Sequence, residues 1–429
     1  MSLDLKSYRG TRDLYPLDMQ LRRYIFDGWR FVVESYGYQE YMAPLIEPTA
    51  TYSAKSGEEI VNEQTYSFSD RGGRNISIRP EMTPSIARMI AARRQETALP
   101  ARLYSIANFM RYERPQHGRE REFWQLNFDL FGVDGVEADI EIIALSYDIL
   151  RHFSATPDMF TIKVNDRKLT NYLMLDYLAL TDNQSQKIIK LLDRYDKLDK
   201  LKFNDLASEI LNDQTKLEKL ESLISVNTLD DLPDSVKNND ITNDLRLVLD
   251  SLSKLGISNA RYDIRLMRGF DYYTGIVFEV FDEAPENRRS MFGGGRYDGL
   301  VGLFGVEPLA TVGAAPGETM FIEFLKAHDL VPEISAKIEN YLIPMTDDLV
   351  AVQKIASQLR CQGVLLAVDL TRRSHNKMIK AAIKNGAKNL LFIGDSEIEA
   401  NKITTKDVSS GEQTSLTLEQ FCNRYAKET

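Results

Sequence analysis

The sequence predicts an α+β protein of two units, and three stretches of the chain carry this prediction. Residues 102–132 alternate apolar and polar side chains on both sides of a charged loop, which is typical of an antiparallel hairpin. Residues 168–256 repeat apolar side chains at helical spacing and contain one glycine, Gly256, which indicates a helical insertion. From residue 340 onward, strand-like and helix-like segments alternate, as in a small α/β unit with parallel strands. We therefore expect a boundary near residues 330–338.

Composition and charge exclude several classes of protein. Hydrophobic residues make up 43% of the 429-residue chain, and the net charge of −10 argues against non-specific coating of nucleic acid. No apolar run reaches the ~18 residues of a membrane span, and the start of the chain lacks a signal-peptide pattern. Cys361 and Cys422 suit a reduced compartment, and with four scattered histidines they offer no metal cluster. We expect a cytoplasmic protein with no membrane partner and no metal held by side chains.

The first 50 residues predict a helix and an interrupted strand. Apolar side chains recur at helical spacing from Leu17 to Val33, and Gly37 follows where such a helix ends. Residues 37–48 then predict a strand that Pro44 breaks.

A second strand and helix follow directly. Ile76 and Ile78 alternate as in a strand, and Thr83 before Pro84 predicts a helix whose first turn is capped by the Thr83 hydroxyl. This order brings the carboxylate of Glu81 to the junction of a strand and a helix N-terminus.

The predicted hairpin has one polar face. Arg111 and Glu113 share a face on its first strand, and Phe123, Gln125 and Asp129 share a face on its second, because side chains alternate with period two. The opposite face of the second strand is apolar and must be core. We therefore expect a polar strip along one side of an antiparallel sheet.

The chemistry of this strip suggests ATP and an amino acid. Guanidinium groups match phosphate oxygens, whereas carboxylates such as Glu113 and Asp129 suit an ammonium group or an exocyclic amine. Phe123 on the same face can stack on a base. The alternative is a ladder of surface salt bridges, each worth ~0–1 kcal/mol.

Two further features are weaker signals. The run GGGRYDG (293–299) permits close backbone approach to a ligand, although such runs are more often turns, and it has neither Walker nor GxGxxG spacing. A basic cluster near the C-terminus is either a solvated face or a binding surface. It comprises Arg372, Arg373, His375, Lys377, Lys380, Lys384 and Lys388.

Several blocks occur in an order typical of one family. They are YRGTRDLYP, GYQEYMAPLIEP, IRPEMTPSIAR, RYERPQHGREREFWQ, RGFDYYTG and GGGRYDGL. On these blocks the chain resembles the histidyl-tRNA synthetases, a class II aminoacyl-tRNA synthetase family, over essentially its whole length.

The resemblance implies a fold and an activity. Residues 1–330 would form the catalytic domain, with a six-stranded antiparallel sheet and an insertion at about 168–256, and residues 338–429 would form an α/β anticodon-binding domain. The protein would be a homodimer with Pro44 at the interface. It would convert histidine and ATP to histidyl-adenylate and pyrophosphate, with Mg²⁺ on the phosphates, and then transfer histidine to the 3′ end of its tRNA.

The resemblance also assigns residues to ATP. Arg111 would hold the α-phosphate, Glu113 would bind the adenine amino group and Phe123 would stack on adenine. Arg119 would reach the outer phosphates, and Arg268 would be a second catalytic arginine at the α-phosphate, beside the histidine.

The resemblance also assigns residues to the binding of histidine and of tRNA. The α-amino group of histidine would meet Glu81, Thr83 and Gln125, and its imidazole would face Asp129 and Tyr273, with Tyr272 beside them. For tRNA the residues would be Gln116 and His117 near an extra 5′ guanosine, and Arg372 and Arg373 at the anticodon stem.

Two positions depart from the commonest family pattern. Asp129 stands where many members have Glu, and Thr319 in GAAPGETMF stands where many have the motif 3 arginine. Arg119 is the candidate for the missing cation. The alternatives are a histidine sensor like the regulatory subunit of ATP phosphoribosyltransferase, a sensor of uncharged tRNA, and a synthetase for another amino acid. The intact block RYERPQHGREREFWQ argues against both sensors, and RGFDYYTG argues against another amino acid.

Overall fold

The computed structural model describes residues 4–53, 64–195, 198–266, 272–287, 289–334 and 338–426. The chain forms two compact units, one of residues 1–14 and 21–331 and the other of residues 15–20 and 332–429. None of the described helices is long and apolar enough to cross a membrane.

The largest sheet of the described chain has eight strands. In sheet order they are β1 (Gln39–Glu40), β5 (Ala101–Met110), β6 (Glu122–Phe131), β11 (Thr311–Ala314), β10 (Ser290–Arg296), β9 (Ile276–Asp282), β7 (Phe160–Asp166) and β8 (Ala260–Tyr262). The six strands from β5 to β7 pair antiparallel, as expected, and β1 and β8 extend the sheet by parallel pairing at its two edges.

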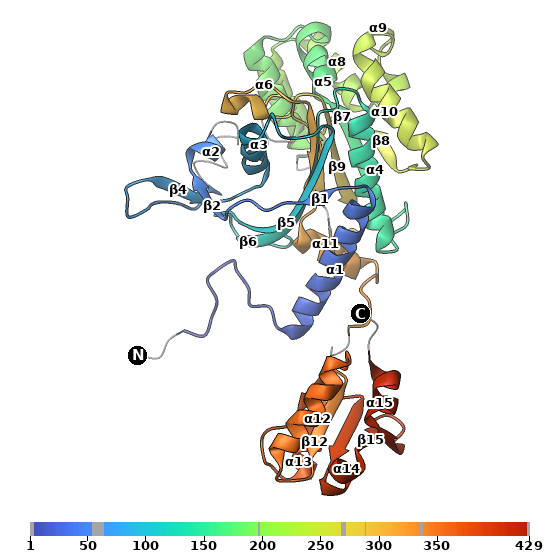
Figure 1. Ribbon diagram of the computed structural model, residues 1–429. Helices are drawn as coiled ribbons and strands as arrows, with labels where there is room; N and C mark the ends of the chain where they lie inside the picture. The colour runs from blue at the N-terminus through green and yellow to red at the C-terminus, as the bar shows by residue number, and fades with distance from the viewer. Residues whose placement is uncertain are drawn as a thin grey trace. The chain divides into compact units, whose positions relative to one another are not determined.

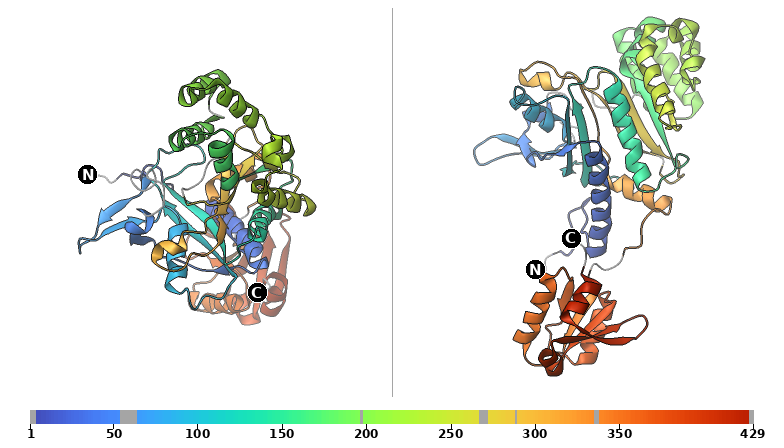
Figure 2. Two further views of the ribbon diagram at one scale, coloured as in Figure 1. Left: turned by 90° about the horizontal axis from the view of Figure 1, so that it is seen from above. Right: turned by 45° about the vertical axis from the view of Figure 1, so that its right-hand side comes forward.

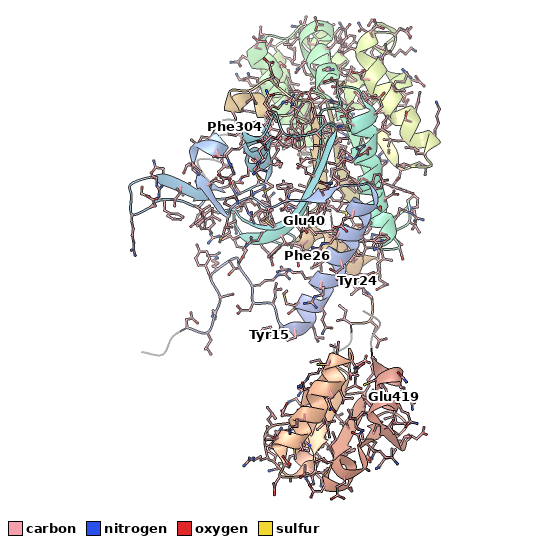
Figure 3. The ribbon with its side chains drawn as sticks, in the orientation of Figure 1. Tyr15, Tyr24, Phe26, Glu40, Phe304 and Glu419 are labelled. Atoms are coloured by element: carbon pink, nitrogen blue, oxygen red, sulfur yellow. The ribbon has the colours of Figure 1, made fainter. Side chains whose placement is uncertain are left out.

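Helices cover one face of this sheet (Figure 1). They are α1 (Pro16–Ser35), α4 (Glu137–His152) and α11 (Glu318–Ala327). Tyr24 and Phe26 of α1, labelled in Figure 3, pack against Phe153 and Trp124 at ring-centroid distances of 5.3 and 5.5 Å. This burial leaves the other face of the sheet for polar side chains.

A small layer precedes the hairpin. The three-stranded sheet has the order β2 (Ile46–Pro48), β4 (Asn75–Ile78), β3 (Ser67–Ser69), with the short helix α2 (Ala50–Ser53) beside it. The strand predicted over 37–48 is therefore two short strands, β1 and β2, on either side of Pro44.

The start of α3 (Thr83–Ala92) corrects one prediction. Thr83 is the first residue of the helix rather than its cap, and no side chain caps α3. Met82 holds the cap position with helical dihedral angles (φ −97°, ψ −30°), whereas a capping side chain needs extended backbone. The Thr83 hydroxyl forms a hydrogen bond with Tyr272 instead.

The predicted insertion is helical throughout its described part. It contains α5 (Arg167–Tyr172), a π-helical turn (Leu173–Tyr177), α6 (Asp182–Leu192), α7 (Lys200–Leu211), α8 (Gln214–Ile224), a 3₁₀ turn (Leu229–Asp231), α9 (Asp234–Lys237), a 3₁₀ turn (Asp240–Thr242) and α10 (Asn243–Lys254). The side chains of Thr181, Asp199 and Asp213 cap α6, α7 and α8. Gly256 ends the insertion with φ +83°, a conformation that favours glycine.

The second unit is a five-stranded sheet with helices on both faces (Figure 2). Its order is β13 (Leu366–Val368), β12 (Asn340–Pro344), β14 (Asn389–Ile393), β15 (Lys402–Asp407) and β16 (Gln413–Thr417). Its helices are α12 (Leu349–Cys361), α13 (His375–Lys384), α14 (Asp395–Ala400) and α15 (Leu418–Tyr425). The first three strands pair in parallel, as predicted, and the last two are antiparallel.

Candidate active site

A cavity of about 1480 Å³ opens on the polar face of the eight-stranded sheet. Side chains from β6, β9, β10 and β11 form its floor, and the first turns of α3 and α11 lie at its edges. The loop between β5 and β6 and the insertion helix α6 complete its wall. All of these elements belong to the first unit.

The alternation predicted for β6 holds in the structure. Phe123, Gln125 and Asp129 line the cavity, whereas Leu126 and Phe128 are fully buried in the core beneath α1 and α4. The strand pairing fixes these positions, since β5 and β6 pair residue by residue from Ala101 to Met110. The polar strip is therefore the floor of a cavity and not an exposed ladder of salt bridges.

One end of the cavity gathers the arginines of the β5–β6 loop. Arg111 lies just beyond β5, its Nε donates to the carbonyl oxygen of Pro80 at 2.9 Å, and its guanidinium lies 5.2 Å from the ring centre of Phe123. Arg119 pairs with Glu113, with 2.8 Å between Nε and Oε2. Burial lowers the pKa of Arg111, although an arginine remains charged at neutral pH. This end can hold phosphate groups beside an aromatic ring.

The tyrosine-lined end holds buried carboxylates, and Glu81 lies next to the arginines, because Arg111 bonds the carbonyl oxygen of the preceding Pro80. Glu81 and Asp129 are 3% and 4% exposed. The hydroxyl of Tyr272 donates to Glu81 at 3.1 Å, and that of Tyr297 donates to Asp129. Burial raises the pKa of Asp129 to about 7, and the bond from Tyr297 opposes that rise. With Tyr273 alongside, this end suits a small cationic or N–H-donating ligand.

Two glycines make room for these side chains. Gly313 of β11 lies opposite Asp129 of β6, and a Cβ on it would come within 2.0 Å of the Asp129 carboxylate. Gly295 of β10 packs against Tyr273 and the backbone of Ile276 in the same way. Gly293, Gly294 and Gly295 therefore belong to strand β10, where their neighbours leave no space for a Cβ, and the turn comes only at residues 298–300.

Most of the residues that the resemblance assigned to ATP and histidine line this cavity. They are Glu81, Thr83, Arg111, Glu113, Arg119, Phe123, Gln125, Asp129, Tyr272 and Tyr273. Arg268 lies outside the described residues.

The expected tRNA residues do not line the cavity, although Gln116 and His117 belong to the β5–β6 loop that forms part of its wall. The ring of His117 bonds Asn287 at 3.1 Å, and the side-chain oxygen of Gln116 accepts from Arg289 at 2.7 Å. Arg372 and Arg373 belong to the second unit and are exposed.

Sequence reasoning missed other residues of the cavity. Tyr297 stands inside the block GGGRYDGL, but nothing in the local pattern pairs it with Asp129. Basic side chains of the insertion also line the wall, and a helical pattern alone does not show which surface they face. These are Lys187, Lys190 and Arg194.

The fold and the cavity together define a class II aminoacyl-tRNA synthetase. Family models match residues 10–316 as histidyl-tRNA synthetase and residues 339–428 as an anticodon-binding domain. A histidine–tRNA ligase of Leptospira biflexa is 38% identical over 432 aligned residues, which cover 99% of this chain and 98% of the relative. The chain therefore belongs to the histidyl-tRNA synthetase family.

Solved structures share the fold. Histidyl-tRNA synthetase from Nostoc sp. PCC 7120 superposes with a TM-score of 0.82 at 24% identity, over 99% of this chain and 100% of that one. An ATP phosphoribosyltransferase regulatory subunit/histidyl-tRNA synthetase from Bacillus halodurans C gives 0.74 at 20% identity, over 91% and 99%. The fold alone does not separate these two kinds of protein.

Proposed function

We propose that the protein is a histidine–tRNA ligase that activates histidine with ATP in this cavity and then transfers it to tRNA. The observation that carries the proposal is the cavity itself, which is lined both by arginines beside Phe123 and by buried carboxylates among tyrosines. ATP fits the first set of residues and histidine fits the second. Membership of the family over the full chain supports the same activity.

In the first step the histidine carboxylate attacks the α-phosphorus of ATP. A carboxylate oxygen–phosphorus bond forms, the bond to the bridging oxygen of the β-phosphate breaks, and pyrophosphate leaves with that electron pair. The carboxylate is already ionised, so the site positions it rather than removing a proton. Arg111, assisted by Arg268, stabilises the negative charge that grows on the α-phosphate oxygens.

Histidine is selected at the tyrosine-lined end. The carboxylate of Glu81 accepts from the α-ammonium group, with Thr83 and Gln125 beside it. Asp129 accepts from an imidazole N–H, and Tyr297 and Tyr273 hold that carboxylate and the ring in place. A buried acceptor left without this N–H discriminates against amino acids of similar size.

The second step uses tRNA. The terminal ribose hydroxyl attacks the carbonyl carbon of histidyl-adenylate and AMP leaves. We assign residues 1–330 to catalysis and residues 338–429 to anticodon binding, with Gln116, His117, Arg372 and Arg373 as tRNA contacts. The protein acts in the cytoplasm as a homodimer that pairs around Pro44.

Mg²⁺ would arrive with ATP. Among the described residues, no group of three or more His, Cys, Asp or Glu side chains is placed to hold a metal ion. Glu120 lines the cavity but pairs with Arg12 at 3.1 Å, so the ion would be bound chiefly by phosphates and water. When bound, the ion neutralises phosphate charge.

The test is histidine-dependent ATP–pyrophosphate exchange, measured with each common amino acid and without tRNA. We expect exchange with histidine alone. Histidine binding by calorimetry without any exchange would instead identify a sensor on the same scaffold, and exchange with another amino acid would refute the specificity.

A further inference from the structure

The first turn of α11 leaves the outer phosphates of ATP without the expected cation. Thr319 lines the cavity there, and its hydroxyl oxygen is buried without a hydrogen-bond partner among the described residues. A hydroxyl carries no charge, whereas a triphosphate carries several. Another group must supply the positive charge at this end.

Among the described residues, seven cationic side chains line the cavity: Arg111, Arg119, Arg167, Lys187, Lys190, Arg194 and Arg289. Arg167, at the start of α5, and Lys187, Lys190 and Arg194 come from the helical insertion. Of the rest, Arg111 packs over the ring of Phe123 and bonds the carbonyl oxygen of Pro80, and the charge of Arg119 is balanced by Glu113 at 2.8 Å. Arg289 differs, because its guanidinium donates a hydrogen bond to the neutral side-chain oxygen of Gln116. Its charge is not offset by that contact.

Hydrogen bonds hold the chain between the end of β9 and Asn287, two residues before Arg289. Asp282, at the end of β9, accepts from the backbone of Ala284 at 2.8 Å and from the side chain of Asn287 at 2.7 Å. Asn287 is 2% exposed, and its side-chain oxygen lies 3.1 Å from the ring nitrogen of His117. His328 bonds Asp282 Oδ1, the oxygen that also accepts from Ala284, at 2.7 Å. These bonds hold the backbone up to Asn287, and the side chain of Arg289 is exposed.

The β5–β6 loop closes the same end of the cavity. Gly118 has φ +69°, and a Cβ on it would come within 2.0 Å of the Met320 sulfur. The loop thus packs directly on the first turn of α11, next to Thr319. This contact brings Arg119, Gln116 and the Arg289 bound to it to the place where Thr319 offers no charge.

We propose that Arg289 binds the outer phosphates of ATP, with Arg119, and supplies the cation that Thr319 cannot. This inference rests on the proposed activity. The guanidinium fork exchanges the side-chain oxygen of Gln116 for two phosphate oxygens. As pyrophosphate leaves, the same fork neutralises the charge that accumulates on it. AMP has no outer phosphates and does not reach Arg289.

The experiment compares Arg289→Ala with the wild type in histidine-dependent ATP–pyrophosphate exchange. We expect the KM for ATP and for pyrophosphate to rise about tenfold to a hundredfold, as for loss of a charged hydrogen bond. The inhibition constant of AMP and the KM for histidine should stay within about twofold. Arg289→Lys, which keeps the charge and loses the fork, should fall in between. Arg261→Ala, an exposed arginine on β8 outside the cavity, is the matched control and should behave as the wild type.

Two results would overturn the inference. One is an unchanged KM for ATP in R289A, which would leave the outer phosphates to Arg119. The other is an equal weakening of ATP and AMP, which would mean that the substitution disturbs the site as a whole. Failure of the wild type to exchange with histidine would instead refute the proposed function.

Discussion

The catalytic cavity contains buried charged residues, whereas the charged residues on helix α13 of the second unit are exposed. In the catalytic cavity the carboxylates Glu81 and Asp129 are almost fully buried, and strand pairing or a helix start fixes their positions. On α13 of the second unit, Lys377, Lys380 and Lys384 are exposed, and the helix buries only residues such as Met378. Burial removes water that would otherwise screen a charge, so the same residue types exert much stronger effects in the first unit.

Two ion pairs make this difference measurable. Arg22 of α1 binds Glu318 of α11 through two bonds of 2.7 and 2.6 Å, and the exposed fractions of their side chains are 10% and 1%. Arg373 pairs with Asp369 at 3.2 Å, with 43% of the arginine side chain exposed. Without Arg22, the buried Glu318 is cut off from water and keeps only the more distant Arg12, at 3.8 Å, whereas without Arg373 the carboxylate of Asp369 is hydrated again.

The largest expected effect is therefore on stability. Arg22→Ala should lower the free energy of unfolding by about 3–5 kcal/mol, and Arg373→Ala by about 0–1 kcal/mol. Urea unfolding followed by far-UV circular dichroism reports both units, and the fluorescence of Trp29 and Trp124 reports the first. The double variant R22M/E318L removes both charges and should be much closer to the wild type. Equal costs for the two arginines would contradict the comparison.

The next effect is on the chemical step. Arg111→Ala should lower the rate of histidyl-adenylate formation about 10²–10³-fold, because a preorganised donor at the developing charge is lost. Single-turnover measurement of adenylate formation checks this, with thermal unfolding as the control for folding. A loss below about tenfold would show that Arg111 is not the main partner of the α-phosphate.

A smaller effect concerns pH. The raised pKa of about 7 means that Asp129 gains its negative charge only as pH rises through neutrality. We expect kcat/KM for histidine to increase across this range and Asp129→Asn to lack that inflection. The ionisation of free histidine near pH 6.5 appears in both proteins and serves as the internal control. Identical profiles would mean that the Asp129 charge takes no part in recognition.

The same shift affects stability with a definite sign. Between about pH 4, where an unfolded aspartate ionises, and pH 7, folded Asp129 keeps a proton that the unfolded chain releases. Its contribution therefore becomes less favourable as pH rises through this window, and D129N should lose that part of the slope. Denaturant midpoints at pH 5 and pH 7.5 test the sign.

The smallest effect is expected at the exposed arginines of the second unit. Removing both charges in R372A/R373A should raise the KM for tRNA by about threefold to tenfold, more at low salt, and leave ATP–pyrophosphate exchange unchanged. Aminoacylation kinetics at two salt concentrations check it. Loss of exchange together with charging would point to misfolding rather than to a tRNA contact.

Much of the fold follows from local patterns. The period-two alternation of β6 separates Phe123, Gln125 and Asp129 from the core side chains without any knowledge of the remaining fold. The helices of the insertion and the alternating elements of the second unit follow from apolar spacing in the same way, and the structure adds the caps of α6, α7 and α8. The prediction failed at Thr83, because the backbone of Met82 had already entered the helix.

Other parts of the site depend on contacts between distant segments. Asp129 and Tyr297 are 168 positions apart, and their bond depends on β10 and β11 lying beside β6. Gln116 and Arg289 are 173 positions apart, and the contact of His117 with Asn287 joins the same two loops. No local period encodes which strand or loop becomes a neighbour.

The sequence by itself determined which side chains of each strand and helix face the core and which remain for chemistry, because those choices repeat every two or 3.6 residues along the chain. Only the tertiary structure decided which of those polar side chains meet. In the tertiary structure Asp129 is buried against Tyr297, and Gly293–Gly295 form part of strand β10. Arg289 meets Gln116 of the β5–β6 loop. The physical reason is that sheet order and packing place residues together across the chain, and burial then changes their charge behaviour in ways that no local pattern records.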